Sequence, residues 1–244
     1  MTENCYHCGK PAVTREHVPP KCLFPEKTEK DYRVNLITVP SCDLHNSVKS
    51  GDDQFMMVYF VALAQNMDYI SLRPHIEKII RTIFRTPYFI SEYTDKLKIV
   101  AADGLTERRD IDWHASENLI EMQSNYERIC SFFAAVARGV LFHTRGVQWD
   151  GGILVMPHFL GTLIADDGTN YTECLSSQIR SENLLGSNKD IFSYADYALG
   201  ETGRYSVDMC FYNEFKVTCN FFSKSKRTDI ESKFGHIEFV RWTE

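Results

Sequence analysis

Cys5-Tyr6-His7-Cys8 and Cys42-Asp43-Leu44-His45 decide the fold of the N-terminal segment, and they enclose the stretch Arg15-Glu16-His17-Val18-Pro19-Pro20. Each outer piece carries two metal-ligand side chains separated by two residues, a spacing at which a tight turn presents both to one tetrahedral Zn²⁺. One zinc ion can therefore join segments that lie far apart in the sequence. The pattern predicts a structural zinc site made by Cys5, Cys8, Cys42 and His45. His7 and Cys22 are alternatives for the fourth ligand, although neither belongs to such a pair.

The composition fits an ordinary globular protein. The chain has 244 residues, of which 43% are hydrophobic and 25% charged, which is enough for one large domain or for a small one and a larger one. The longest apolar runs, Met56–Ala64 and Phe132–Ala137, are too short to cross a bilayer, and the N-terminus has no secretion signal. We therefore expect a cytoplasmic protein without a membrane partner. Reduced, packed thiols are expected at the cysteines outside the zinc pattern: Cys130, Cys174, Cys210 and Cys219.

The charge argues against strong binding of nucleic acid by this chain alone. The formal net charge is −6 and the isoelectric point is about 5.8, whereas contacts to phosphates need a basic surface. We therefore expect weak binding of nucleic acid by this chain alone, or help from a protein partner or from a second copy in a homo-oligomer.

The N-terminal segment predicts two strands followed by a helix. Residues 10–17 predict the first strand, which Pro19-Pro20 ends, and residues 34–39 predict the second, which Pro40 ends. A helix is expected to begin at residues 42–46, to be interrupted at Ser50-Gly51 and to continue from residue 52 to residue 66.

The remainder predicts an α+β fold in which a mostly antiparallel sheet packs on a long helix. Apolar residues recur every three or four positions from Ser116 to Phe142, with Ser116 as N-cap and Gly146 after the end, and a shorter helix is expected at 74–84. Period-two alternation predicts a hairpin of 205–212 and 215–221 around Asn213-Glu214. Further strands are expected at residues 153–159, 193–199 and 236–242.

Five features of residues 5–53 occur in a characteristic order: the Cys5/Cys8 pair, Glu16-His17, Asn35-Leu36, the Cys42/His45 pair and Asn46. In this order the segment resembles the HNH, or His-Me finger, endonucleases, whose fold is the zinc-stabilised ββα-metal finger. It departs from the usual pattern in three places. Glu16 stands where aspartate is usual, His45 where cysteine is commoner, and Asn46 where many members have histidine. Each replacement keeps a suitable donor atom.

The resemblance implies a role for each motif residue. His17 would be the general base that activates water, Glu16 and Asn46 would hold one catalytic Mg²⁺ or Mn²⁺, and Asn35 would be structural, its side chain bonding across the loop. Lys49 would touch a phosphate, unless it is simply a solvated side chain. The chemistry agrees, because imidazole can accept a proton near neutral pH and a hard cation prefers carboxylate and amide oxygens.

The sequence therefore predicts a metal-dependent DNA endonuclease. Residues 1–70 would form the HNH-like nuclease domain, and residues 71–244 an α+β domain that docks a partner or restricts the target. The acidic charge also suits an effector that another protein recruits, for example in bacterial defence against foreign DNA. The alternatives are a non-catalytic zinc module that binds protein or nucleic acid, and an RNase. No role is assigned to several side chains near the end of the long helix, where basic residues favour the helix dipole: Arg138, His143, Arg145, Trp149 and His158.

Overall fold

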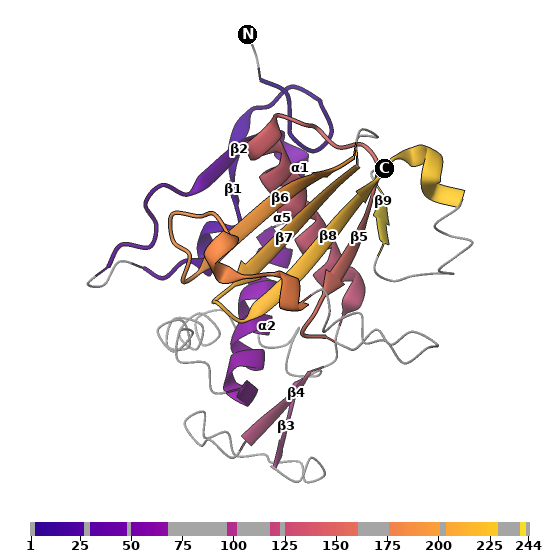
Figure 1. Cartoon of the computed structure of the whole chain (residues 1–244). Coiled ribbons are helices and arrows are strands. Elements are labelled where there is room, and N and C mark those ends of the chain that lie inside the picture. Colours follow the sequence, from indigo (N-terminus) through magenta and orange to yellow (C-terminus); the bar gives the residue numbers. More distant parts are fainter. Residues whose placement is uncertain are drawn as a thin grey trace. The chain divides into compact units, whose positions relative to one another are not determined.

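The structure is a computed structural model of the whole chain. It describes residues 3–26, 30–47, 50–67, 97–101, 118–122, 125–160, 176–200, 204–228 and 240–242. Its contacts form two compact units, one of Met1–Asp53 with Tyr126–Glu244 and one of Gln54–Asn125. The predicted domains 1–70 and 71–244 divide the chain differently, because their boundary rests on a change of sequence pattern, and they stay a prediction. Figure 1 labels the elements.

The first unit begins with a two-stranded antiparallel sheet. β1 (Thr14–Val18) pairs with β2 (Ile37–Ser41), and this register places Glu16 opposite Val39. The helices α1 (Asp43–Ser47) and α2 (Ser50–Met67) follow, so the predicted order of two strands and a helix is confirmed. The predicted end of the second strand at Pro40 is wrong. The backbone N and C=O of Pro40 face the edge of β2 away from β1, where no N–H is needed for the strand pairing, and its carbonyl accepts a hydrogen bond from the Tyr6 amide at 2.9 Å.

The same unit contains a five-stranded sheet in which every pair of neighbours is antiparallel. The order is β6-β7-β8-β5-β9. The predicted hairpin of β7 and β8 is confirmed, and it turns through Tyr212 and Asn213, which have φ of 54° and 62°. The bounds are β5 (Gly152–Pro157), β6 (Phe192–Leu199), β7 (Arg204–Phe211), β8 (Phe215–Phe222) and β9 (Val240–Trp242). Residues 236–239 of the last predicted strand lie outside the described residues.

Helix α5 (Tyr126–Arg145) packs on one face of this sheet, as predicted. Phe133 is fully buried with its ring centroid 5.6 Å from that of Phe211 on β7, and the thiol of Cys219 on β8 contacts the Phe133 carbonyl at 3.9 Å. The end of the helix also agrees with the prediction. Gly146 has φ of 66°, and its amide donates to the Phe142 carbonyl at 2.8 Å.

The predicted start of this helix at Ser116 is wrong. The helix begins at Tyr126, because residues Asn118–Met122 form β4, which pairs antiparallel with β3 (Leu97–Ala101). Both strands belong to the second unit, as does most of α2, where Phe55 and Tyr59 stack with their ring centroids 5.8 Å apart. The predicted helix at 74–84 lies outside the described residues. None of the helices in the described part of the chain is long and apolar enough to span a membrane.

The end of β1 packs tightly on α5. A Cβ added at Gly139 would lie only 2.5 Å and 2.8 Å from the two methyl carbons of Val18. Both residues belong to the first unit, and Val18 is 3% exposed. Gly139 therefore lets the strand that carries Glu16 and His17 approach the helix closely.

We expect Gly139→Ala to destabilise the protein by about 1–3 kcal/mol, because overpacking a tight contact outweighs the better helix propensity of alanine. Urea unfolding measures this change. The matched test is the same substitution in a Val18→Ala background, which lacks the clashing methyls. There Gly139→Ala should cost clearly less, because only the Cβ of residue 18 remains, 3.2 Å from the added Cβ, and an equal loss in both backgrounds would contradict the contact.

On the sheet face away from α5, three polar side chains form a chain of hydrogen bonds. The Thr218 hydroxyl donates to Asp208 Oδ1 at 2.7 Å and lies 3.0 Å from His158 Nε2. Because the hydroxyl proton is used on Asp208, His158 is the donor in the second bond. Burial, with help from the positive charge of Lys216, lowers the pKa of His158 to about 4.

This lowered pKa predicts a stability that depends on pH. The unfolded chain binds a proton at His158 near pH 6.5 and the folded chain only near its pKa of about 4, so stability falls as the pH drops through this window. We expect a loss of about 1 kcal/mol between pH 7 and pH 5, less than the full linkage value because the side chain is partly exposed. His158→Gln keeps the donor and the titration of Asp208. A pH dependence as steep in this variant as in the unmodified protein would contradict the assignment.

Candidate metal centre and neighbouring cavity

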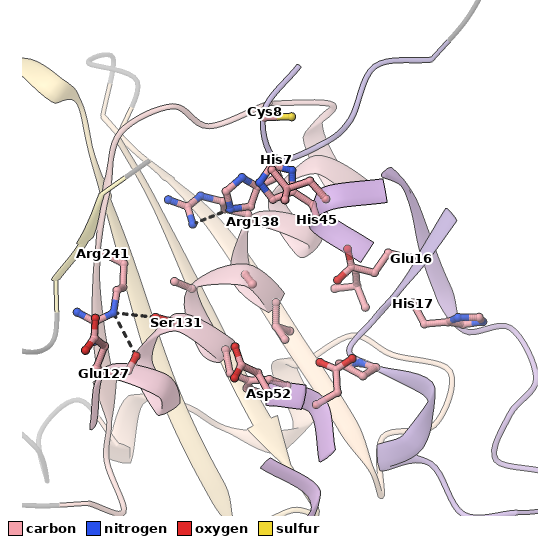
Figure 2. A pocket seen from close by; sticks show the side chains of 18 of the residues that line it. His7, Cys8, Glu16, His17, His45, Asp52, Glu127, Ser131, Arg138 and Arg241 are labelled. Carbon is pink, nitrogen blue, oxygen red and sulfur yellow. Dashed lines mark hydrogen bonds between the residues drawn. The ribbon is translucent and has the colours of Figure 1, made fainter. Parts of the chain in front are cut away.

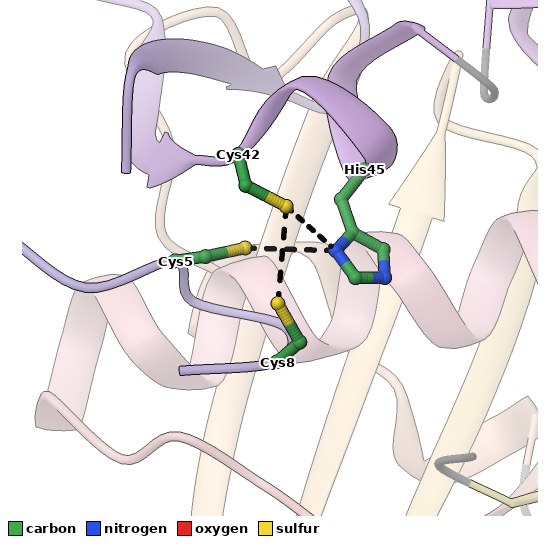
Figure 3. Close-up of side chains that lie close together, drawn as sticks. All are labelled: Cys5, Cys8, Cys42 and His45. Atoms are coloured by element: carbon green, nitrogen blue, oxygen red, sulfur yellow. Dashed lines mark hydrogen bonds between the residues drawn. The ribbon is translucent and has the colours of Figure 1, made fainter. Parts of the chain in front are cut away.

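Two tight turns present the four predicted zinc ligands (Figure 3). Cys5 and Cys8 lie in the turn before β1, which closes with the Gly9 amide bound to the Cys5 carbonyl at 2.9 Å. Cys42 directly follows β2, and the His45 amide donates to the Cys42 carbonyl at 3.1 Å in the first turn of α1. The spacing of two residues in each pair is therefore realised as a hydrogen-bonded turn.

The ligand atoms of these residues converge on one point. Cys8 Sγ lies 3.8 Å from Cys42 Sγ, and His45 Nδ1 lies 3.7 Å from Cys5 Sγ and 3.2 Å from Cys42 Sγ. All four ligand atoms lie within 4.8 Å of one another. Tetrahedral zinc with Zn–S bonds of about 2.3 Å places sulfur atoms about 3.8 Å apart, so the cluster has the dimensions of a zinc site. A Cys₃His cluster that could bind a metal such as zinc is therefore confirmed.

Neither alternative ligand joins this cluster. The ring of His7 stacks on that of His45, and the Cys22 thiol contacts the Asp53 carbonyl at 3.7 Å. The remaining described cysteines, Cys130, Cys210 and Cys219, are buried and reduced as expected, and Cys174 lies outside the described residues.

The turn also favours a thiolate at Cys5. Burial raises the pKa of the Cys5 thiol, but the backbone amides of Cys8, Cys42 and His7 point to the sulfur and together lower this pKa below its ordinary value. Amide donors of this kind stabilise the charged sulfur that binds a metal.

A cavity of about 690 Å³ lies beside the cluster in the first unit. β1 contributes Glu16 and His17 to its lining, the start of α2 contributes Asp52, and α5 contributes Arg138 (Figure 2). Glu16 is 9% exposed, and its Oε2 lies 3.4 Å from the Ser41 hydroxyl, which donates to it. The structure therefore brings two of the predicted catalytic residues to one cavity.

Glu16 and His17 project from opposite sides of β1, as neighbours in a strand must (Figure 2). His17 is half-buried, and burial lowers its pKa below the ordinary value, assisted by the positive charge of Lys21 and opposed by Glu16. Among the described residues, none makes a hydrogen bond to the His17 imidazole. A neutral imidazole is thus available at the cavity near pH 7.

Asn46 does not line this cavity. Its side-chain amide donates to the Thr14 hydroxyl at 2.9 Å, and Thr14 lies two residues before Glu16 on the same face of β1. Asn35 is exposed in a left-handed conformation with φ of 54°, which asparagine tolerates, so a side-chain bond across the loop stays a prediction. Lys49 lies outside the described residues.

The opposite wall of the cavity was not predicted. It holds Arg138 and Ser131 from α5 and Arg241 from β9, whose Nε donates to the Ser131 hydroxyl at 3.0 Å (Figure 2). One signal was present in the sequence, because Arg138 interrupts the buried apolar run Phe132–Leu141 of the long helix. The helix dipole does not explain Arg138, because a guanidinium that is only 5% exposed is not a solvated side chain at a helix end.

Comparisons with protein-family models, with curated proteins and with solved structures find no match to this chain. The resemblance to the HNH endonucleases therefore rests on the motif residues of the sequence.

Proposed function

We propose that this protein is a metal-dependent endonuclease of the HNH type that hydrolyses phosphodiester bonds in DNA. The observation that carries the proposal is the position of Glu16 and His17 on one cavity beside a Cys₃His cluster. In this proposal β1, β2 and the helix after them make a ββα-metal finger, and zinc is its structural ion.

His17 is the general base. Its lowered pKa leaves the imidazole neutral near pH 7, the form that can accept a proton. The imidazole takes a proton from water, the water oxygen bonds to phosphorus, and the bond from phosphorus to the leaving sugar oxygen breaks. That oxygen takes a proton from solvent. In this proposal the phosphate lies in the cavity that Glu16 and His17 both line, although the two side chains point to opposite sides of β1.

One divalent cation, Mg²⁺ or Mn²⁺, would be held by Glu16 and Asn46 and would stabilise negative charge on the phosphate. Among the described residues, the Cys₃His cluster is the one group of three or more His, Cys, Asp or Glu ligand atoms close enough to share a metal. In this proposal the cation takes its other ligands from water and from the substrate. Mg²⁺ commonly binds in this way, through one or two carboxylates and substrate phosphates.

The charge of the chain limits how it holds nucleic acid. Asp52 and Asp53 line the cavity and the net charge is −6, so phosphate contacts depend on a small number of basic groups. A protein partner or a second copy of the chain would supply the remaining affinity. Attack at a phosphate does not read the sugar, so RNA is a second possible substrate.

One observation favours the non-catalytic alternative, a zinc module that binds protein or nucleic acid. The Asn46 side chain already donates to Thr14 and does not line the cavity. In a zinc module of this kind, Glu16 and His17 line the same cavity without taking part in a reaction.

One cleavage experiment distinguishes the endonuclease from the zinc module. Purified protein is incubated with plasmid DNA, and separately with single-stranded RNA, in Mg²⁺, in Mn²⁺ or in a chelator that leaves the structural zinc bound. The endonuclease cleaves in a cation-dependent manner and loses this activity in His17→Ala with zinc content and circular dichroism retained. Equal behaviour of the two proteins supports the zinc module. His143→Ala, which removes an exposed histidine from the last turn of α5, is the matched control.

A further inference from the structure

Two contacts of His7 connect the metal cluster to α5. The His7 ring lies over the His45 ring with centroids 4.0 Å apart and an angle of 21° between the planes. Arg138 Nη1 on α5 lies 3.5 Å from His7 Nε2 (Figure 2). His7, in the turn between Cys5 and Cys8, therefore links α5 to a ligand of the cluster.

The two histidines use different nitrogen atoms in these contacts. An arginine nitrogen can only donate, so His7 Nε2 is the acceptor toward Arg138. His45 directs Nδ1 toward the sulfur atoms of Cys5 and Cys42, so this nitrogen is the one that would bind the metal.

The charges are also complementary. Three thiolates and one Zn²⁺ carry a net charge of −1 in surroundings where Cys5 is fully buried. Arg138 carries a positive charge although it is 5% exposed, and burial lowers its pKa only to about 10. A buried guanidinium is costly unless an opposite charge lies nearby, and the cluster supplies one close to His7, with Cys5 and Cys42 buried and Cys8 and His45 half-buried.

We propose that Arg138 and His7 are positioning residues of the zinc centre: they hold the plane of the His45 ring and offset the negative charge of the Cys₃His cluster. The proposal requires zinc in the cluster and does not depend on nuclease activity. It makes α5 part of the metal site, so that metal binding and the packing of the N-terminal turn on the helix support each other.

Zinc affinity of the full chain, measured by competition with a chromophoric chelator, tests this proposal. Arg138→Met should weaken zinc binding about 10-fold to 100-fold, the usual effect of losing a group that supports a metal ligand. Arg145→Met is the matched control. It also removes a guanidinium from α5, but this guanidinium pairs with Asp196 and not with His7. An equal loss in both variants, or no loss in Arg138→Met, overturns the proposal.

A second pair of variants keeps the test decisive if Arg138→Met does not fold. His7→Phe retains a ring that can stack on His45 and loses the acceptor for Arg138, and Arg138→Lys retains the charge. Bound Co²⁺ reports ligand geometry through its visible absorption, so His7→Phe should shift these bands and weaken metal binding, whereas Arg138→Lys should recover part of the affinity. In the double variant of His7→Phe and Arg138→Met the two effects should be less than additive. An unchanged Co²⁺ spectrum with unchanged affinity in His7→Phe overturns the proposal.

Discussion

Cys42→Ser is expected to lose nearly all of the one zinc ion that we predict per chain, and with it the folded structure of the N-terminal turns and the β1-β2 sheet. Serine leaves the site with two sulfur ligands and one nitrogen, and its hydroxyl is not deprotonated near neutral pH. A structural zinc ion of this type contributes about 10–16 kcal/mol of binding energy in small zinc-binding peptides, far more than a two-stranded sheet gains from its own packing.

The structure defines how far this unfolding should spread. Val18 packs on Gly139, and Tyr6 lies against Phe142 with ring centroids 6.5 Å apart, so contacts with α5 hold part of the segment. The β6-β7-β8-β5-β9 sheet has a core of its own and should persist. Metal analysis together with hydrogen exchange of the full chain measures both effects, and fast exchange should be confined to the segment before α2.

Cys22→Ser is the matched control for this prediction. Cys22 lies in the same segment and is half-buried, but its thiol contacts the Asp53 carbonyl instead of the cluster. This variant should keep its zinc and its exchange pattern. Full zinc occupancy in Cys42→Ser would show that the ligand set is wrong.

The sequence predicted those features that depend on neighbouring residues. The spacing within Cys5/Cys8 and within Cys42/His45 encodes two local turns, and a shared ion needs only that these turns meet. The alternation in β7 and β8 likewise follows from one hairpin. Local patterns were therefore enough to predict the metal cluster, the hairpin of β7 and β8, and the packing of the sheet on a long helix.

The errors arose where distant contacts decide the structure. Leu119 and Met122 are three residues apart, which suits a helix, yet their segment pairs with β3 and becomes a strand. Pro40 continues a strand because only one edge of β2 is paired. The position of Arg138 beside His7 joins residues 131 positions apart, and no local pattern can indicate such a contact.

His17→Ala is expected to reduce cation-dependent cleavage of plasmid DNA by about 10²-fold to 10⁴-fold, the usual contribution of a general base. The substitution removes a half-buried side chain with no hydrogen bond to another described residue, so folding and zinc content should be retained. The unmodified protein should show a second signature. Because burial lowers the pKa of His17, the base is already neutral at pH 7, and the rate should rise with pH only below that pKa and be flat above it.

In His17→Ala this rise should disappear from the residual rate, and in His143→Ala both the rate and its pH profile should be unchanged. Cleavage by His17→Ala at the rate of the unmodified protein would remove His17 from the mechanism and leave the zinc module as the better description.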